Sequence, residues 1–244
     1  MNNKILVIGD SCRDIFCYCS SDRMCPDKPV PIIKILDQTE NPGMAYNTFK
    51  NIKSIYKNCD IITNYNWHDV TKTRYIHKNS NHMFLRIDSI NKIDRFDVKK
   101  INFSEYNLIC ISDYDKGFLT EDDIYYISKN HSCTFLDSKK ILGKWADHIS
   151  YIKINNHEYD RSKSYLTPTV KSKIIKTMGG DGCLFQNKIY PVKKVEVVDL
   201  SGAGDSFMAA LVCNFIKTQD IITAIKFANK CACKVVQQKG MTLI

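Results

Sequence analysis

The chain has 244 residues, 44% hydrophobic and 25% charged, and this balance excludes a disordered protein because the apolar side chains suffice to form a core. The most apolar stretch, Phe207 to Ile216, is about half as long as the ~20 residues of a membrane-spanning helix, so we expect no membrane protein. The formal charge of +9 is dispersed along the chain, which argues against a nucleic-acid partner and suits an anionic small substrate such as a phosphate ester.

The N-terminus indicates a protein without a secretory signal. Met1 to Lys4 leads directly into the apolar run Ile5 to Ile8, which is too short for the core of a signal peptide. We therefore expect a cytoplasmic protein in which the eleven cysteines stay reduced. The cysteines are scattered through apolar segments, and their spacing does not match that of a zinc site.

Short apolar runs alternate with helix-length segments along much of the chain. The runs that we expect to be strands are Lys4 to Ile8, Leu108 to Ser112, Cys133 to Leu136, Ile149 to Ile154 and Lys173 to Thr177. Continuous apolar runs are typical of parallel strands that are buried on both faces. Between two of them, Thr120 to Asn130 predicts a helix with Thr120 as its N-cap. This order predicts an α/β fold with a central, mostly parallel sheet flanked by helices.

Two segments depart from the parallel pattern and predict a small antiparallel β lid. Val30 to Gln38 is rich in β-forming residues, and Thr73 to His77 and Met83 to Ile87 read as two strands joined by a polar turn. We expect the lid strands within about residues 12–38 and 71–88 of a single domain that covers residues 1–244.

The chain closes with two predicted helices, Ala203 to Lys217 and Asp220 to Gln237, and the first should be buried because it is apolar nearly all round. The β-run Val197 to Leu200 leads into it through the turn Gly202-Ala203-Gly204. The unpaired N–H groups at such a helix start suit a phosphate. Asp205 would repel that phosphate, but it fits a base that takes a proton from an attacking hydroxyl. The local sequence leaves a second interpretation open, in which the glycines allow a tight turn and Asp205 caps the helix.

The segment Asp199 to Asp205 resembles the signature of the ribokinase-like (PfkB) carbohydrate kinases, with Leu200 in place of the usual Thr. Other segments, in the same order along the chain, are similar to the bacterial heptose 7-phosphate kinases. They are Gly9 to Asp14, Pro29 to Pro31, Asn41 to Asn47, Thr71 to Arg74, Leu85 to Asp88, Ser112 to Gly117 and Asp137 to Lys139. The resemblance covers most of the chain and implies a ribokinase-like fold and a kinase that uses ATP and Mg²⁺.

The resemblance also implies roles for individual residues. Asp205 would be the catalytic base, and Gly202, Ala203 and Gly204 would form the anion hole for the transferred phosphoryl group. The positions implied to bind the acceptor are Asp14, Gly43, Asn47, Arg74, Arg86, Asp113 and Lys116. The positions implied to bind the nucleotide are Thr177, Gly179, Gly182 and Asn229. Asn155 and Glu158 match an N-x-x-E element that would organise Mg²⁺ and its waters.

Some of these residues have simpler interpretations. Asn155 also suits the N-cap of a helix, and Arg74, Arg86 and Lys116 also suit solvated surface charges. Met44 stands where the family usually has the second glycine of a hinge, and a side chain there should stiffen the hinge or crowd the site. The chain is also shortened relative to the family by roughly one βα unit, mainly within residues 47–71 and 158–173.

Taken with the resemblance, these residues predict an ATP-dependent kinase for the anomeric hydroxyl of a sugar phosphate, most similar to the enzymes that convert D-glycero-D-manno-heptose 7-phosphate to the 1,7-bisphosphate. The resemblance further implies a homodimer that pairs through the lid, around Cys17 and Val30 to Leu36. Two alternatives remain open. One is a kinase for another sugar or a nucleoside, and the other is a non-catalytic sugar-phosphate-binding protein on a shortened kinase fold.

Overall fold

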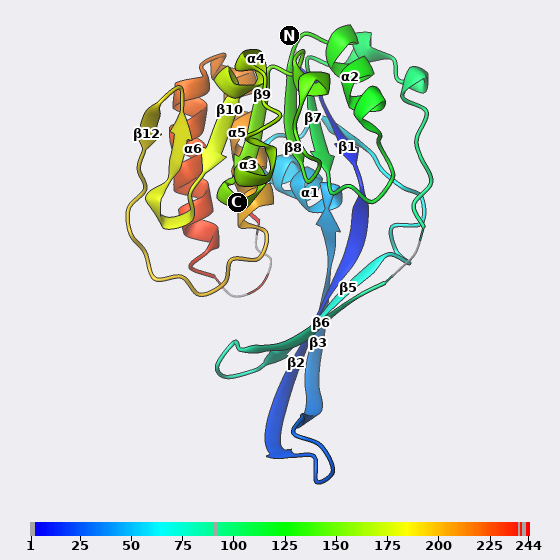
Figure 1. Ribbon diagram of the computed structural model, residues 1–244, viewed down its shortest axis with the longest axis vertical. Coiled ribbons are helices and arrows are strands. Elements are labelled where there is room, and N and C mark those ends of the chain that lie inside the picture. The colour runs from blue at the N-terminus through cyan, green and yellow to red at the C-terminus, as the bar shows by residue number, and fades with distance from the viewer. Residues whose placement is uncertain (1–2, 90–91, 239, 241–242) are drawn as a thin grey trace.

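A computed structural model describes residues 3–89, 92–238, 240 and 243–244. Among these residues, eight strands form one large sheet in the order β12-β11-β10-β9-β8-β7-β1-β4 (Figure 1). They are β1 (Ile5–Gly9), β4 (Cys59–Ile62), β7 (Leu108–Asp113), β8 (Thr134–Ser138), β9 (Tyr151–Asn155), β10 (Ile174–Thr177), β11 (Cys183–Phe185) and β12 (Lys188–Tyr190). The strands from β4 to β10 are parallel, and β11 and β12 add an antiparallel edge. The mostly parallel sheet and the five predicted strands are confirmed.

Helices cover both faces of this sheet (Figure 1). One face packs against α1 (Ala45–Ile55), α5 (Ala203–Thr218) and α6 (Ile221–Val235), and the other lies beneath α2 (Glu121–Asn130), α3 (Asn156–Ser162) and α4 (Pro168–Ser172). Along β1, Ile5 and Val7 belong to the first core, whereas Leu6 and Ile8 belong to the second. A strand buried on both faces needs apolar side chains at every position, which explains the continuous run in the sequence.

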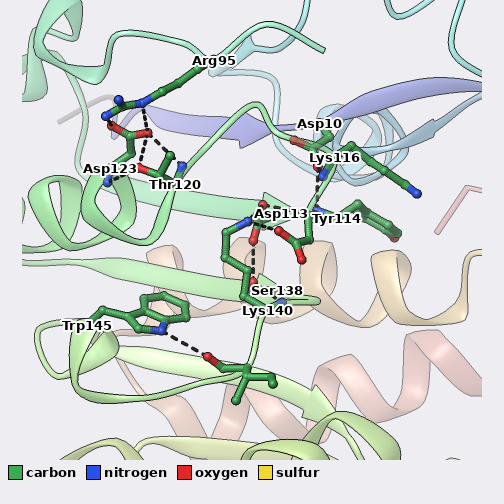
Figure 2. Close-up of polar contacts among 12 residues, drawn as sticks. Asp10, Arg95, Asp113, Tyr114, Lys116, Thr120, Asp123, Ser138, Lys140 and Trp145 are labelled. Atoms are coloured by element: carbon green, nitrogen blue, oxygen red, sulfur yellow. Dashed lines mark hydrogen bonds and ion pairs between the residues drawn. The ribbon is translucent and has the colours of Figure 1, made fainter. Parts of the chain in front are cut away.

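Capping side chains mark the starts of two of the predicted helices, α2 and α6. Thr120 caps α2, accepting a hydrogen bond from the backbone N–H of Asp123, whose carboxylate accepts one from the Thr120 N–H in return. Figure 2 shows Arg95 forked onto the same carboxylate, with contacts of 2.6 and 2.7 Å. Asp220 caps α6 by accepting from the N–H groups of the first turn. The buried character predicted for α5 is confirmed, since its apolar side chains are almost all buried.

The lid is a separate four-stranded sheet in the order β3-β2-β5-β6. It consists of β2 (Ser11–Met24), β3 (Pro31–Met44), β5 (Thr71–His77) and β6 (Met83–Asp88). The antiparallel prediction is wrong for one pair, because β2 and β5 are parallel and the sheet is therefore mixed. β2 follows β1 directly, and β5 follows the segment after β4. Because β1 and β4 are parallel neighbours in the large sheet, β2 and β5 leave it in the same direction and pair in parallel. The β2–β3 hairpin projects far from the body (Figure 1).

The strand predicted at Val197 to Leu200 is absent, since residues 191–201 form an irregular connection. Val198 and Asp199 donate their backbone N–H groups to the carbonyl of Val236 at the end of α6 rather than to a neighbouring strand. Leu200 is 69% exposed. A β-forming sequence without a partner strand remains a loop, and this loop runs past the start of α5.

Met44 adopts a backbone conformation that normally requires glycine. Its φ is 60° and its ψ is −133°, at the junction between β3 and α1. Its side chain is buried, so the position combines a strained backbone with a well-packed side chain. Met44 thus keeps a glycine-like backbone at the position of the expected hinge, and its side chain lines the smaller of the two cavities described below.

All eleven cysteines are free thiols. No helix within the described ranges is both long and apolar enough to cross a membrane.

Candidate active site

Asp205 lies in the first turn of α5, where Gly202 begins the helix with a φ of 76°. Its side chain is buried, and both carboxylate oxygens accept a hydrogen bond. The Asn47 amide donates to Oδ2 over 2.8 Å, and the Tyr114 hydroxyl donates to Oδ1 over 2.6 Å. Burial raises the pKa of Asp205, and these two hydrogen bonds oppose the rise. The carboxylate is therefore held in a fixed orientation and is a stronger base than an exposed aspartate.

Tyr114 is a site residue that the sequence analysis did not assign. Asp10, at the end of β1, accepts hydrogen bonds from the backbone N–H groups of Tyr114 and Lys116 over 3.1 and 2.8 Å (Figure 2). Asp10 thus shapes the turn after β7 and places the Tyr114 ring against Asp205. Tyr114 stands inside a segment that resembles the kinase family, but the partner of its hydroxyl is 91 residues away in the sequence.

A cavity of about 830 Å³ opens on one side of Asp205. The residues predicted for the anion hole and the nucleotide all line it, namely Gly202, Ala203, Gly204, Thr177, Gly179, Gly182 and Asn229. Gly182 has a φ of 88°, and a Cβ there would lie 2.1 Å from the carbonyl oxygen of Tyr190, so only glycine fits this turn between β10 and β11. The cavity is large enough for a cofactor-sized ligand.

Two lysines and two carboxylates from β8, β9, α3 and the segment after β8 lie in or next to the wall of this cavity. Lys153 lies 2.6 Å from Asp137 Oδ2, and Lys139 pairs with Glu158. A Cβ added at Gly204 would lie 3.0 Å from the Lys153 ammonium, so this glycine lets the ammonium approach the start of α5. Burial raises the pKa of Asp137, but the two lysines outweigh it and the net shift is downward. The Lys153 ammonium therefore lies beside the start of α5, where an anion would meet the helix.

Asn155 and Glu158 form a capping box at the start of α3. Asn155 Oδ1 accepts from the Glu158 N–H over 2.9 Å, and Glu158 accepts from the Asn155 N–H over 2.8 Å and also from Lys139. Glu158 is a poorer candidate for direct contact with Mg²⁺, because Lys139 and the Asn155 N–H already hold its two oxygens. Asp137 Oδ1 fits better, since this hard oxygen is buried and has no hydrogen-bond partner among the described residues. Asp137 and Asn155 both line the large cavity.

Across the described part of the chain, no three His, Cys, Asp or Glu side chains gather as they would around a metal ion.

A second cavity of about 270 Å³ lies on the lid side of Asp205. Three of the predicted acceptor residues line it, namely Asp14, Arg74 and Arg86, together with Met44 and the unassigned Lys72. The Arg74 guanidinium lies 2.5 Å from Asp14. Gly43 does not line the cavity but makes room for Asp14, because a Cβ at Gly43 would lie 2.3 Å from Asp14 Oδ2. Asn47 contacts Asp205 instead of facing the cavity.

Besides Gly43 and Asn47, two more predicted acceptor residues line neither cavity. Asp113 is fully buried, accepts from the Ser138 hydroxyl over 2.5 Å and pairs with Lys140 at 3.3 Å (Figure 2). Lys116 is exposed, and its backbone rather than its side chain contacts Asp10. Both belong to the turn that holds Tyr114, so the motif that suggested them supports the site indirectly.

The two cavities meet at Asp205. Tyr114, Lys139, Gly202 and Asp205 line both of them. A ligand in the glycine-lined cavity and a ligand in the cation-lined cavity would therefore face each other across this carboxylate and the start of α5. Such an arrangement can transfer a group between two bound ligands, with a base at the point of transfer.

Comparison with known proteins agrees with this geometry. The family model described as pfkB family carbohydrate kinase matches residues 134–243. This part of the chain is similar to the pfkB carbohydrate kinases. It contains Asp205, the helix start and the residues that line the glycine-rich side of the large cavity.

Curated relatives extend the similarity over nearly the whole chain. A bifunctional protein HldE of Helicobacter pylori (strain Shi470) is 26% identical over 98% of this chain and 64% of the relative. The HldE of a Nitratiruptor species is also 26% identical, over 98% of this chain and 63% of the relative. The chain thus spans less than two thirds of the length of these relatives. The Helicobacter alignment covers 300 positions against the 244 residues present here, which agrees with the predicted shortening.

Solved structures show the fold. A ribokinase from Thermotoga maritima superposes with a TM-score of 0.74 at 15% identity, covering 98% of this chain and 94% of the ribokinase. A nucleoside kinase from Methanocaldococcus jannaschii gives a TM-score of 0.72 at 17% identity, and the alignment covers 99% of this chain and 93% of the nucleoside kinase. An Arabidopsis thaliana ribokinase complexed with ribose and ATP gives a TM-score of 0.72 at 12% identity, and the alignment covers 98% of this chain and 94% of that ribokinase. The predicted ribokinase-like fold is confirmed.

Proposed function

We propose that this protein is an ATP-dependent sugar kinase that phosphorylates the anomeric hydroxyl of a sugar phosphate. The observation that carries this proposal is the position of Asp205, a buried carboxylate at a helix start where a glycine-lined cavity and a cation-lined cavity meet. The larger cavity would hold the nucleotide, with its terminal phosphate at the start of α5. The smaller cavity would hold the acceptor beneath the lid.

The proposed reaction uses Asp205 as the base. The carboxylate takes the proton of the acceptor hydroxyl, the hydroxyl oxygen forms a bond to the γ-phosphorus, and the bond from that phosphorus to the bridging oxygen of ADP breaks. Negative charge spreads over the oxygens of the transferred group. The N–H groups at the start of α5 and the Lys153 ammonium lie where they would stabilise that charge.

The resemblance implies Mg²⁺ together with the nucleotide. When bound, the ion would supply positive charge to the phosphate oxygens, and Asp137 and Asn155 are the residues of the large cavity that would hold it or its waters. Glu158 would then act on Asn155 and Lys139 rather than on the ion.

For the acceptor, we propose D-glycero-D-manno-heptose 7-phosphate, which would yield the 1,7-bisphosphate. Two observations support it, the similarity to bifunctional HldE proteins along nearly the whole chain and the cations that line the small cavity. The ribokinases and nucleoside kinases with the same fold favour the alternative that the acceptor is another sugar or a nucleoside.

A panel of acceptors tests the proposal. ADP release from ATP would be measured with the heptose 7-phosphate, other sugar phosphates, unphosphorylated sugars and nucleosides. We expect acceptor-dependent release that is fastest with the heptose 7-phosphate. Release confined to nucleosides would reassign the acceptor. If none of the panel stimulates release although the sugar phosphate binds, the protein is a non-catalytic binder and the kinase proposal is wrong.

We further propose that the lid pairs two subunits. The projecting β2–β3 hairpin exposes large apolar side chains that a monomer would leave in water, namely Met24, Val30, Ile35 and Leu36. Cys17 is buried within the lid itself, so the contact would be made by β3 and the hairpin end. Light scattering after gel filtration should give the mass of a dimer, and the double variant Ile35→Asp, Leu36→Asp should give that of a monomer. A monomer for the unmodified chain at micromolar concentration would contradict this proposal.

A further inference from the structure

The strand register of the lid places two rows of side chains on its cavity-lining face. Asp14, Lys72 and Asp88 are aligned across β2, β5 and β6, and two residues along each strand Phe16, Arg74 and Arg86 form the next row. Residues two apart on a strand share a face, so three cations and two carboxylates are gathered on this face. Lys72, Arg74, Arg86 and Asp14 line the small cavity.

Both arginines are already paired with an acid. Arg74 lies 2.5 Å from Asp14 and its guanidinium lies over the Phe16 ring, 5.0 Å from the centroid. Arg86 is forked onto Asp88 with contacts of 2.6 and 2.5 Å. Charge-assisted pairs of this kind satisfy the fork of a guanidinium. The two arginines therefore carry little unpaired charge toward an incoming ligand.

Lys72 differs from both. The residue is only 8% exposed, and its ammonium forms no hydrogen bond or ion pair within the described part of the chain. Its ammonium lies over the Tyr114 ring, 4.9 Å from the centroid. Burial lowers the pKa of Lys72, and the charges of the nearby Asp14 and Asp88 offset this only in part. A buried, unpaired ammonium in a cavity wall is unfavourable until an anion enters that cavity.

We propose that the Lys72 ammonium binds the phosphate of the acceptor. This inference rests on the proposed function and deepens it, because it names the residue that selects a phosphorylated sugar over a neutral one. Tyr114 links the two ends of the acceptor site, since its ring lies beneath Lys72 while its hydroxyl contacts Asp205. A sugar whose hydroxyl faces Asp205 can therefore present its phosphate to Lys72 within the same small cavity. Arg74 and Arg86 keep Asp14 and Asp88 from repelling that phosphate.

The variant Lys72→Met removes the charge and keeps an apolar stem of similar length. With D-glycero-D-manno-heptose 7-phosphate as acceptor, we expect its KM to rise about 10- to 100-fold, which corresponds to the loss of one charge-assisted contact. The KM for the unphosphorylated heptose and for ATP should stay within about twofold. Lys34→Met is the matched control, because Lys34 is an exposed lid cation paired with Asp22 outside both cavities. Lys34→Met should leave the KM for the heptose 7-phosphate, for the unphosphorylated heptose and for ATP unchanged.

A binding measurement separates this inference from the kinase proposal. Calorimetry without ATP would compare the heptose 7-phosphate with the unphosphorylated heptose on the unmodified protein, Lys72→Met and Lys72→Gln. A selective loss of phosphate binding in both variants supports the inference even if no acceptor stimulates ADP release. Unchanged binding of the 7-phosphate, or an equal loss of both ligands, overturns it while leaving the kinase proposal intact. The inference would also be overturned if Arg86→Gln selectively lost binding of the 7-phosphate and Lys72→Met did not. That result would show that Arg86 rather than Lys72 binds the phosphate.

Discussion

The hydroxyl of Tyr114 donates a hydrogen bond to Oδ1 of Asp205 across 2.6 Å, while Asn47 occupies Oδ2. Asp205 thus has a donor on each oxygen before any acceptor arrives. A carboxylate oxygen can accept more than one hydrogen bond, so an acceptor hydroxyl can join without displacing either donor. The two donors fix the direction in which the base points and moderate its pKa, which makes Tyr114 a positioning residue for the proposed reaction.

Replacing Tyr114 by Phe should lower kcat about 10-fold, because one hydrogen bond to a charged group is lost. That bond lowers the pKa of Asp205, so its loss should raise this pKa and move the acidic limb of the kcat/KM profile to higher pH. The measurement is kcat/KM against pH for the best acceptor of the panel.

Tyr125→Phe serves as the control for that experiment, since Tyr125 lies on α2 and lines neither cavity. A Tyr114→Phe profile that coincides with that of the unmodified protein would show that the hydroxyl does not act on Asp205.

Asp10 should make folding stability depend on pH. Burial, with repulsion from Asp113, raises the pKa of Asp10 to about 6 in the folded protein, whereas the ordinary value is 3.8. The folded state then binds more protons than the unfolded state between these values. Stability should therefore fall as pH rises from about 4 to about 6, by about 3 kcal/mol at most for this group.

The variant Asp10→Asn keeps an acceptor oxygen for the Tyr114 and Lys116 N–H groups but cannot ionise. Its Tm should exceed that of the unmodified protein at pH 7.5, and the difference should shrink toward pH 4. Exposed Asp69→Asn should show no such trend. A difference in Tm that does not vary between pH 4 and pH 7.5 would rule out the ionisation of Asp10 as its cause.

Gly43→Ala should weaken acceptor binding through Asp14. The added Cβ would lie 2.3 Å from Asp14 Oδ2, so the carboxylate must move and its contact with Arg74 is lost. We expect the acceptor KM to rise about 10-fold while the KM for ATP stays unchanged. Gly143→Ala is the control, because the nearest atom to its added Cβ lies 3.8 Å away. Equal KM values in the two variants would show that Asp14 does not hold the acceptor.

Local patterns predicted the parts of the site that depend on neighbouring residues. The apolar runs indicated the strands, and the glycines before Asp205 and at position 182 indicated turns, of which Gly202 and Gly182 have the positive φ that favours glycine. These features predicted the helix start and the glycine-lined cavity, because backbone geometry and residue type are tied together within a few positions.

Contacts between distant segments were not predictable in this way. The partners of Asp205 come from α1 and from the turn after β7, and the unpaired state of Lys72 emerges only when Arg74 and Arg86 have taken the nearby acids. Asp113 was predicted to bind the acceptor because of its motif, yet it faces Ser138 and Lys140. The parallel pairing of β2 with β5 likewise depends on where each strand leaves the body.

The most direct test of the account is the turnover of Asp205→Asn with ATP and the heptose 7-phosphate, or with the acceptor that the panel identifies. An amide of the same size keeps one acceptor oxygen for a neighbouring donor, but it cannot take the proton of the acceptor. We predict a kcat lower by about 10²- to 10⁴-fold, with cooperative thermal unfolding and with binding of ATP and acceptor retained. A kcat within twofold of the unmodified protein would contradict the assignment of Asp205 as the base.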